Sequence, residues 1–376
     1  GVVIDQAGER IYLVDEQASY VIAIRRDRAA LFALDIGRER LGGSVKRLRA
    51  QLDPSSHRSA RALPAAFPAD LAHQLFLSIL APADPLIGDA SHLLIVPDDA
   101  LHSLPFAVLV TGLSDTSRTA WLARRHSLSV LPAEGALPAL RGPGRAAGGS
   151  KSFAGFGDPL LRAEDERAAS IGGLARLPES RYVLDAMAAI LQANPRDVYL
   201  EAEATERAVK RLDLADYRVL AFATYALLAG DVRDGAEPAL VLTLPRVGSE
   251  LDDGLLTASE VARLKLDADL VVLSAASTAR ADGTPGAGGL PRMAGAFLHA
   301  GARSLLVSHW VVREDSTLKL VSRMLRERAR GAGNAEALQR SMLALMNGED
   351  RVAYTHPMYW APFAVVGEGG RRAGQN

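Results

Sequence analysis

Residues 289–310 read GLPRMAGAFLHAGARSLLVSHW and join a helical pattern to a short apolar run. The helical pattern covers residues 293–300. Residues 304–308 are almost continuously apolar, which is typical of a strand buried on both faces. A helix followed by such a strand is the repeating unit of a parallel sheet with helices packed on it. This stretch therefore predicts an α/β fold.

The same alternation extends in both directions along the chain. Further apolar runs predict strands at residues 93–96, 153–156, 219–223, 270–274 and 363–366. The segments between them predict helices at residues 68–80, 182–191, 205–212, 257–264, 316–328 and 335–346. We expect a three-layer αβα sandwich with a mostly parallel central sheet, because alternating strands and helices favour that arrangement.

The amino-terminal part has a different pattern. Residues 19–24 and 29–34 are apolar and β-prone around a polar turn, which predicts a β-hairpin. Residues 41–52 carry apolar side chains at helical spacing. We therefore divide the chain into a hairpin-and-helix lead-in, residues 1–57, and a main α/β domain, residues 58–376.

Composition and charge exclude several classes of protein. The 376 residues are 48% apolar, which is enough for a sizeable core and excludes disorder for most of the chain. A net charge of -1 gives no basic field, so we expect no nucleic-acid partner. The longest apolar stretches fall short of the roughly 18–20 residues of a membrane helix, so we expect a soluble protein with no membrane partner. We expect its location to be cytoplasmic. Because the chain begins with Gly1, we expect it to be a fragment of a longer protein.

Several kinds of chemistry are also excluded. The sequence has no cysteine, so disulfides, cysteine-based zinc sites and thiolate catalysis are impossible for the chain as it stands. It has no GxSxG, GxGxxG, P-loop or HExxH motif. None of the eight histidines has another four residues away, so we expect no metal and no cofactor.

Candidate site residues follow the predicted strands. In an open parallel sheet, binding and catalytic groups gather at the carboxyl ends of the strands. The residues at such ends are Tyr225, Ser274, Ala276, Ser277, His309, Asp158 and the pair Asp98 and Asp99. We therefore expect a crevice there.

Six blocks of the sequence, in this order, resemble the CHAT domain. This is a caspase-like (clan CD) peptidase domain often found after tetratricopeptide repeats. The blocks are VPDDALHSLPF (96–106), FGDP (156–159), EPALVL (237–242), DDGLLTASEVARLKLDADLVVLSA (252–275), GLPRMAGAFLHAGARSLLVSHW (289–310) and HPMYWAPFAVVG (356–367). The resemblance implies a caspase-like fold, a protein or peptide partner, and tetratricopeptide repeats upstream in the same protein.

The resemblance also implies a catalytic dyad. The family has a histidine in an ATHG- or ATHA-like segment and a cysteine as the third residue of SAC-x-T. This sequence has ATYA at residues 223–226 and SAAST at residues 274–278, so Tyr225 and Ala276 stand at the two positions. The residues before both positions match the family, which supports the alignment.

Neither of these side chains supports covalent peptide hydrolysis. A methyl group is no nucleophile, and a phenol with an ordinary pKa of about 10 is a poor proton acceptor at neutral pH. Ser277 does not inherit the line of attack, because neighbouring residues at a strand end point in different directions. We therefore expect a pseudopeptidase that binds protein or peptide, or acts as a scaffold.

Two alternatives remain. In the first, the native protein is an active cysteine endopeptidase that was inactivated by substitution. Tyr225 argues against it, because the base would have been replaced as well as the nucleophile. In the second, the protein is an interaction module that acts only through its surface beside the repeats. An open groove at Ala276 would favour peptide binding, whereas a groove filled by Tyr225 would favour a purely structural role, and we expect the filled groove.

Two candidates have a structural and a functional interpretation. Asp158 either receives a basic side chain of a bound peptide or caps backbone amides in a turn, and we favour the turn. The same choice applies to Asp98 and Asp99. We interpret His309 as a structural histidine, and Thr257 with Glu260 as a helix-capping pair.

Overall fold

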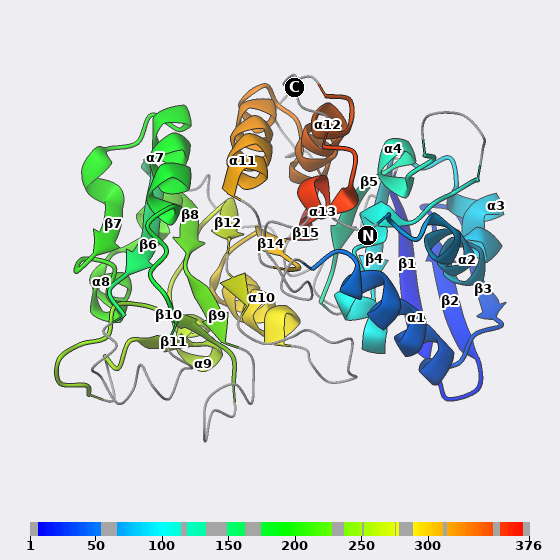
Figure 1. The fold of residues 1–376 in the computed structure, drawn as a ribbon, viewed down its shortest axis with the longest axis horizontal. Helices are drawn as coiled ribbons and strands as arrows, with labels where there is room; N and C mark the ends of the chain where they lie inside the picture. Colours follow the sequence, from blue (N-terminus) through cyan, green and yellow to red (C-terminus); the bar gives the residue numbers. More distant parts are fainter. Residues whose placement is uncertain are drawn as a thin grey trace.

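The computed structural model describes residues 7–53, 66–113, 119–132, 149–161, 174–227, 237–249, 252–274, 276–277, 289–310, 314–348 and 354–370. Eleven described strands form one sheet in the order β3-β2-β1-β4-β5-β15-β14-β12-β8-β6-β7 (Figure 1). Their bounds are β1 Ala7–Val14, β2 Ser19–Ile24, β3 Ala29–Leu34, β4 His92–Val96, β5 Ser127–Val130, β6 Lys151–Pro159, β7 Val198–Glu201, β8 Tyr217–Ala223, β12 Leu270–Leu273, β14 Ser304–Ser308 and β15 Phe363–Gly367.

A second, smaller sheet has the order β11-β10-β9-β13. Its strands are β9 Tyr225–Leu227, β10 Ala239–Val241, β11 Leu255–Thr257 and β13 Ala276–Ser277. The described α-helices are α1 Arg38–Ala50, α2 Ala69–Ile79, α3 Asp84–Ile87, α4 Leu122–Arg125, α7 Ser180–Ile190, α8 Glu206–Arg211, α9 Ala258–Val261, α10 Gly289–Ala300, α11 Glu314–Ala329, α12 Asn334–Met346 and α13 Pro357–Trp360.

Helices cover both faces of the main sheet. In Figure 1, α7, α11 and α12 lie on one side of the sheet, and α9 and α10 lie on the other. The buried apolar residues form a separate cluster on each face. In β14, Leu306 joins the first cluster, whereas Leu305 and Val307 join the second. A strand that supplies both clusters must be apolar at every position, which confirms the three-layer fold predicted from residues 304–308.

Nine of the eleven described strands of the main sheet form two parallel halves that run in opposite directions, and β2 and β3 extend the first half as an antiparallel hairpin. Strands β1, β4, β5 and β15 run parallel to their neighbours in this group, and so do β14, β12, β8, β6 and β7. The halves meet where β14 pairs antiparallel with β15. The carboxyl end of β4 therefore lies at the edge opposite to the carboxyl ends of β6, β8, β12 and β14.

This opposition corrects one prediction about the site. Asp98 and Asp99 follow β4, so they do not join the side chains at the ends of β6, β8 and β12. Asp98 instead accepts hydrogen bonds from the backbone amides of Val14 and Asp99, at 2.8 and 2.9 Å. Arg38 forms an ion pair with Asp99 at 3.0 Å. Asp98 thus has the turn role that we favoured, whereas Asp99 contacts a guanidinium.

The amino-terminal region contains more sheet than the sequence predicted. The hairpin of β2 and β3 is confirmed, with Ser19 opposite Leu34 and Ile24 opposite Ala29. Strand β1 precedes it and pairs with both β2 and β4, so the hairpin continues the main sheet. A domain boundary after residue 57 stays a prediction.

Candidate functional site

Two strand extensions bring Tyr225 and Ala276 together. After Ala223, the last residue of β8, the chain passes Thr224 and enters β9. The Thr224 hydroxyl donates a hydrogen bond to the Val241 carbonyl, which ties this corner to β10. The chain likewise continues from β12 to β13, and β9 and β13 pair in parallel with Tyr225 opposite Ala276. The two sequence motifs therefore lie side by side, with Tyr225 and Ala276 as Cα partners of neighbouring strands.

The surroundings of Tyr225 keep its phenol protonated. The side chain is partly buried and packs against the small apolar cluster of Leu227, Val241 and Leu244. Burial raises the pKa of Tyr225, and the negative charge of Glu179 raises it further. Within the described part of the chain, the phenol makes no side-chain hydrogen bond. A phenol in this state cannot act as a general base at neutral pH.

The two predicted serines flank this position. Ser274 is partly buried just after β12, and its backbone amide donates to the Phe222 carbonyl at 3.1 Å. Ser277 is the register partner of Ala226. The side chains of residues 275–280 lie outside the described part of the structure, so the orientation expected for Ser277 stays a prediction.

His309 lies directly after β14, at the same edge of the sheet. Its amide donates to the Pro362 carbonyl at 2.7 Å, and its own carbonyl accepts a hydrogen bond from Arg49 at 2.6 Å. Burial and the charge of Arg49 lower the pKa of His309 to about 3. The imidazole is therefore neutral at physiological pH. Its neighbour Trp310 is fully buried and donates to the Met358 carbonyl at 3.3 Å.

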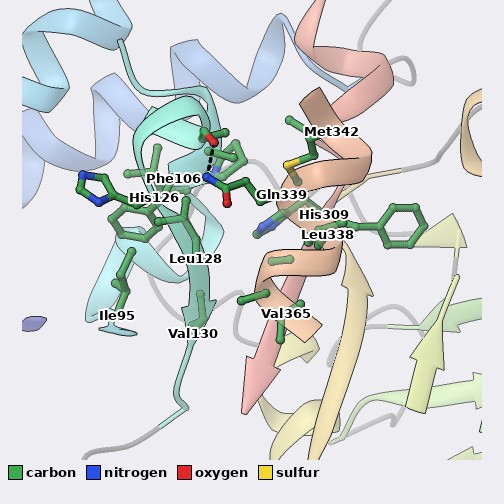
Figure 2. Close-up of a pocket in the computed structure, with 18 residues that line it drawn as sticks. Ile95, Phe106, His126, Leu128, Val130, His309, Leu338, Gln339, Met342 and Val365 are labelled. Carbon is green, nitrogen blue, oxygen red and sulfur yellow. Dashed lines mark hydrogen bonds between the residues drawn. The ribbon is translucent and has the colours of Figure 1, made fainter. Parts of the chain in front are cut away.

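His309 also borders an apolar cavity (Figure 2). The cavity lies between α12, β5, β15 and the segment that contains Phe106, and the Gln339 amide at its rim donates to the Ala123 carbonyl at 2.9 Å. Its volume is about 40 Å³. Pockets for small ligands are typically about 300–1,000 Å³, so this cavity is too small for a cofactor or a peptide. Neither Tyr225 nor Asp158 lines it.

Asp158 occupies a bulge at the end of β6. The register with β7 shifts between Gly157 and Pro159, and the backbone of Asp158 is left-handed, with φ 45°. A bulge redirects a side chain, and here it turns the carboxylate towards Arg176. Arg176 donates from Nε to Oδ1 at 3.2 Å and from Nη2 to Oδ2 at 2.5 Å.

The turn interpretation of Asp158 stays a prediction, because residues 162–173 lie outside the described part of the chain. Among the hydrogen bonds of the described residues, its carboxylate binds a guanidinium and caps no backbone amide. The carboxylate accepts a basic side chain here, and this arginine comes from the same chain and not from a bound peptide. The fully buried carboxylate and Glu201 together raise the pKa of Arg176.

Sequence reasoning also missed Glu206, which organises the nearby turn. Its carboxylate is buried and accepts hydrogen bonds from the amides of Asp253 and Gly254, at 2.8 and 2.9 Å. Lys210 forms an ion pair with the same carboxylate. Gly254 is left-handed, with φ 87°, which favours glycine in this turn. The capping pair predicted after it, Thr257 and Glu260, is confirmed.

Metal clusters and membrane-spanning helices are both absent from the described residues. No three histidine, aspartate or glutamate side chains gather there in an arrangement that could hold a metal ion. No helix in the described ranges combines the length and the apolar character needed to cross a membrane.

Comparisons with known proteins agree with this architecture. A model of the CHAT domain matches residues 69–368. Tetratricopeptide repeat protein 28 of Mus musculus is 34% identical over 113 residues, and its Homo sapiens counterpart is 32% identical over 117 residues. These matches cover 30% and 31% of this chain but only 4% of each relative.

Solved structures give the same fold over a longer span. Two crystal structures of the Saccharomyces cerevisiae separase–securin complex match with a TM-score of 0.51 and 10% sequence identity. Each match covers 96% of this chain and 30% of the other. At this identity the likeness concerns the fold alone, and it identifies the architecture as caspase-like.

Proposed function

The chain belongs to the CHAT domain family, and from this premise we propose that it is a pseudopeptidase that binds protein or peptide without cleaving it. The binding site in this proposal is the edge at the carboxyl ends of β6, β8, β12 and β14. The bound segment would lie beside Tyr225 and Ala276, where a peptidase of this fold would carry out its chemistry.

The register of Tyr225 opposite Ala276 is the observation that carries the proposal. Strands β9 and β13 hold the two positions side by side, as a nucleophile and its base require. The residues at those positions supply a methyl group and a protonated phenol. Removal of the nucleophile lowers the rate of a serine protease by about six powers of ten. A protein in which only the reactive groups are replaced therefore loses catalysis but can keep its binding site.

The comparisons support a protein or peptide as the partner. Two relatives are tetratricopeptide repeat proteins, and the matched solved structures are complexes of separase with the protein securin. We therefore place this domain in a longer protein with such repeats and assign it a protein ligand.

The test restores the missing chemistry. We expect the double variant Ala276→Cys with Tyr225→His to react with iodoacetamide at pH 7 about tenfold faster than Ala276→Cys alone. A free thiol with a pKa of about 8.5 is only a few per cent thiolate at this pH, and a neighbouring imidazole increases that fraction. The double variant should also cut β-casein, because cleavage requires a polypeptide bound between the two side chains.

Each negative outcome has a defined meaning. If the folded double variant reacts no faster than the single variant, the dyad geometry is absent and the proposal is wrong. If it reacts faster but leaves β-casein intact, the geometry is present but no polypeptide binds there. That second result would favour an interaction module that acts through its surface.

One observation favours the surface alternative. Leu13, Tyr20 and Leu31 expose 48%, 38% and 63% of their surface, although they are large apolar residues. Leu13 and Tyr20 are register partners, and Leu31 is the partner of Ile22 in the adjacent row. These side chains share one face of β1, β2 and β3, and exposed apolar patches of this kind commonly mark protein contacts.

A further inference from the structure

Arg176 links the carboxyl ends of two neighbouring strands. Its guanidinium binds Asp158 of β6 through two nitrogen atoms and also donates to Oε1 of Glu201, the last residue of β7, at 3.0 Å. Asp158 is 1% exposed, whereas the Arg176 side chain is 44% exposed. The acceptor is therefore part of the core, and the arginine approaches it from the solvent side.

The backbone on the acceptor side is shaped for this contact. Asp158 and Glu201 both have left-handed backbones, with φ 45° and 51°. Such conformations cost on the order of 1–3 kcal/mol each in residues other than glycine, and they persist only where the surroundings impose them. The Asp158 amide is fixed by a hydrogen bond to the Ser180 hydroxyl at 2.8 Å. Both carboxylates are thus held towards the Arg176 guanidinium, and Glu201 also contacts Arg181.

The segment that carries Arg176 also reaches Tyr225. Leu174 packs against the same small apolar cluster as Tyr225. Glu179, at the other end of the segment, is close enough to raise the pKa of the Tyr225 phenol. Residues 174–179 therefore lie along the edge where we propose that peptides bind, and Arg176 anchors them there.

We propose that Arg176 is an internal occupant of a guanidinium site formed by Asp158 and Glu201, and that residues 174–179 block this edge until an arginine-bearing protein segment displaces them. This inference rests on the proposed function, because it assumes that the ligand binds at the same edge. The inference adds two points to the proposed function. The ligand side chain is a guanidinium, and the contact of Arg176 with Asp158 excludes that side chain.

The contact between Arg176 and Asp158, which we call the latch, can break without unfolding the protein. A tethered group has an effective concentration of about millimolar, so it excludes free ligands that bind weakly. When a site is open for only a fraction of the time, the apparent dissociation constant of its ligand is the intrinsic constant divided by that fraction. Arg176 is nearly half exposed and can leave without unpacking the core, whereas Asp158 stays in place. Removal of the Arg176 charge should therefore increase the affinity for an external guanidinium.

The test uses the segment's own sequence as the probe. A fluorescein-labelled peptide LARLPE, which copies residues 174–179, is titrated against the protein and followed by fluorescence anisotropy. We expect Arg176→Met to bind it at least about tenfold more tightly than the unsubstituted protein, which corresponds to opening of the site. The same peptide with methionine in place of its arginine should not show this gain.

Arg181→Met is a matched control. The Arg181 side chain is also 44% exposed and contacts Glu201 at 3.5 Å, but it does not touch Asp158. We expect it to leave peptide binding unchanged. Adding Asp158→Asn to Arg176→Met should abolish the gain in affinity, with thermal unfolding used to confirm that the double variant folds.

Three results would overturn the latch. They are equal affinity of Arg176→Met and the unsubstituted protein, an equal gain with the methionine peptide, and an equal gain in Arg181→Met. Thiol labelling of the double variant Ala276→Cys with Tyr225→His does not involve Arg176. Failure of the latch and failure of the pseudopeptidase proposal are therefore distinguishable.

Discussion

Tyr225 and Ala276 are Cα partners in the parallel pair of β9 and β13, just beyond the ends of the two neighbouring central strands β8 and β12. The main sheet sets this relationship, because β8 and β12 are themselves in register, with Phe222 opposite Leu273. A substitution at either position therefore changes the chemistry of the site without changing the strands that present it.

The first prediction concerns the Tyr225 phenol. Its pKa is raised by burial and by Glu179, so we expect it to ionise above the usual value of about 10. Absorbance near 295 nm, measured as the difference between the unsubstituted protein and Tyr225→Phe, should give this pKa. Stability should fall as pH rises from 10 towards that pKa, because the unfolded chain loses the proton first. A difference titration with a midpoint below 10 would contradict the prediction.

The second prediction concerns acid stability. The pKa of His309 is lowered to about 3, so between pH 6.5 and 3 the unfolded chain binds a proton that the folded protein does not. Stability should therefore decrease as pH falls through this window, by at most about 1.4 kcal/mol per pH unit for one proton. His309→Gln cannot titrate and should reduce this slope in urea denaturation series. Identical slopes for the two proteins would exclude the assigned pKa.

The third prediction concerns the buried carboxylate of Glu206. Glu206→Ala removes the acceptor for the amides of Asp253 and Gly254, and an unsatisfied buried donor costs about 1–3 kcal/mol. We expect chemical denaturation to show a loss of about 2–4 kcal/mol, which includes the lost ion pair with Lys210. Glu336→Ala, which weakens a more exposed ion pair with Arg340, should cost no more than about 1 kcal/mol.

The fourth prediction concerns the glycine before Asp158. A methyl group at Gly157 would lie 2.7 Å from Leu184, 2.9 Å from the Ser180 hydroxyl and 3.0 Å from the Ala223 carbonyl. Gly157→Ala should therefore push α7 away from β6 and cost about 1–3 kcal/mol, measured by thermal or urea unfolding. Gly43→Ala is the control, because nothing lies within 4 Å of that position in α1. It should stabilise the protein slightly, by up to about 1 kcal/mol.

The sequence predicted those strands that consist of continuous apolar residues, because an apolar run indicates burial on both faces. Strands β4, β8, β12, β14 and β15 are apolar runs, and their predicted bounds differ from the observed ones by at most two residues. Strand β1 was missed because it contains Glu9 and Arg10, and Arg10 is fully buried despite its charge. Strands β9 and β13 were missed because three and two residues carry no periodicity.

The helix predicted at residues 257–264 was too long. Helix α9 ends at Val261, and the chain then turns towards β12. The start of the helix was correct because Thr257 and Glu260 cap it through local hydrogen bonds. The end of the helix depends on how the residues after Val261 pack, and the sequence around Val261 contains no pattern that predicts this packing.

The candidate site was only partly visible in the sequence. The motifs located Tyr225 and Ala276 because each follows an apolar strand, and the structure brings them into register. The opposite direction of the two sheet halves was not visible, because an apolar run has the same pattern in either direction. The contact of Arg176 with Asp158 was not visible either, since it depends on a bulge that a sequence pattern does not encode. The acidic residue at a strand end in FGDP was the one signal that pointed to it.

Strand β15 is the last described strand in the chain, yet it lies between β5 and β14 in the interior of the sheet. During synthesis on the ribosome, the other ten strands emerge before it. Until residues 363–367 leave the exit tunnel, β5 and β14 each present a bare edge, and such edges are prone to pair with foreign chains. The β1–β4–β5 group and the β14–β12–β8–β6–β7 group therefore become one sheet only when β15 is added between them.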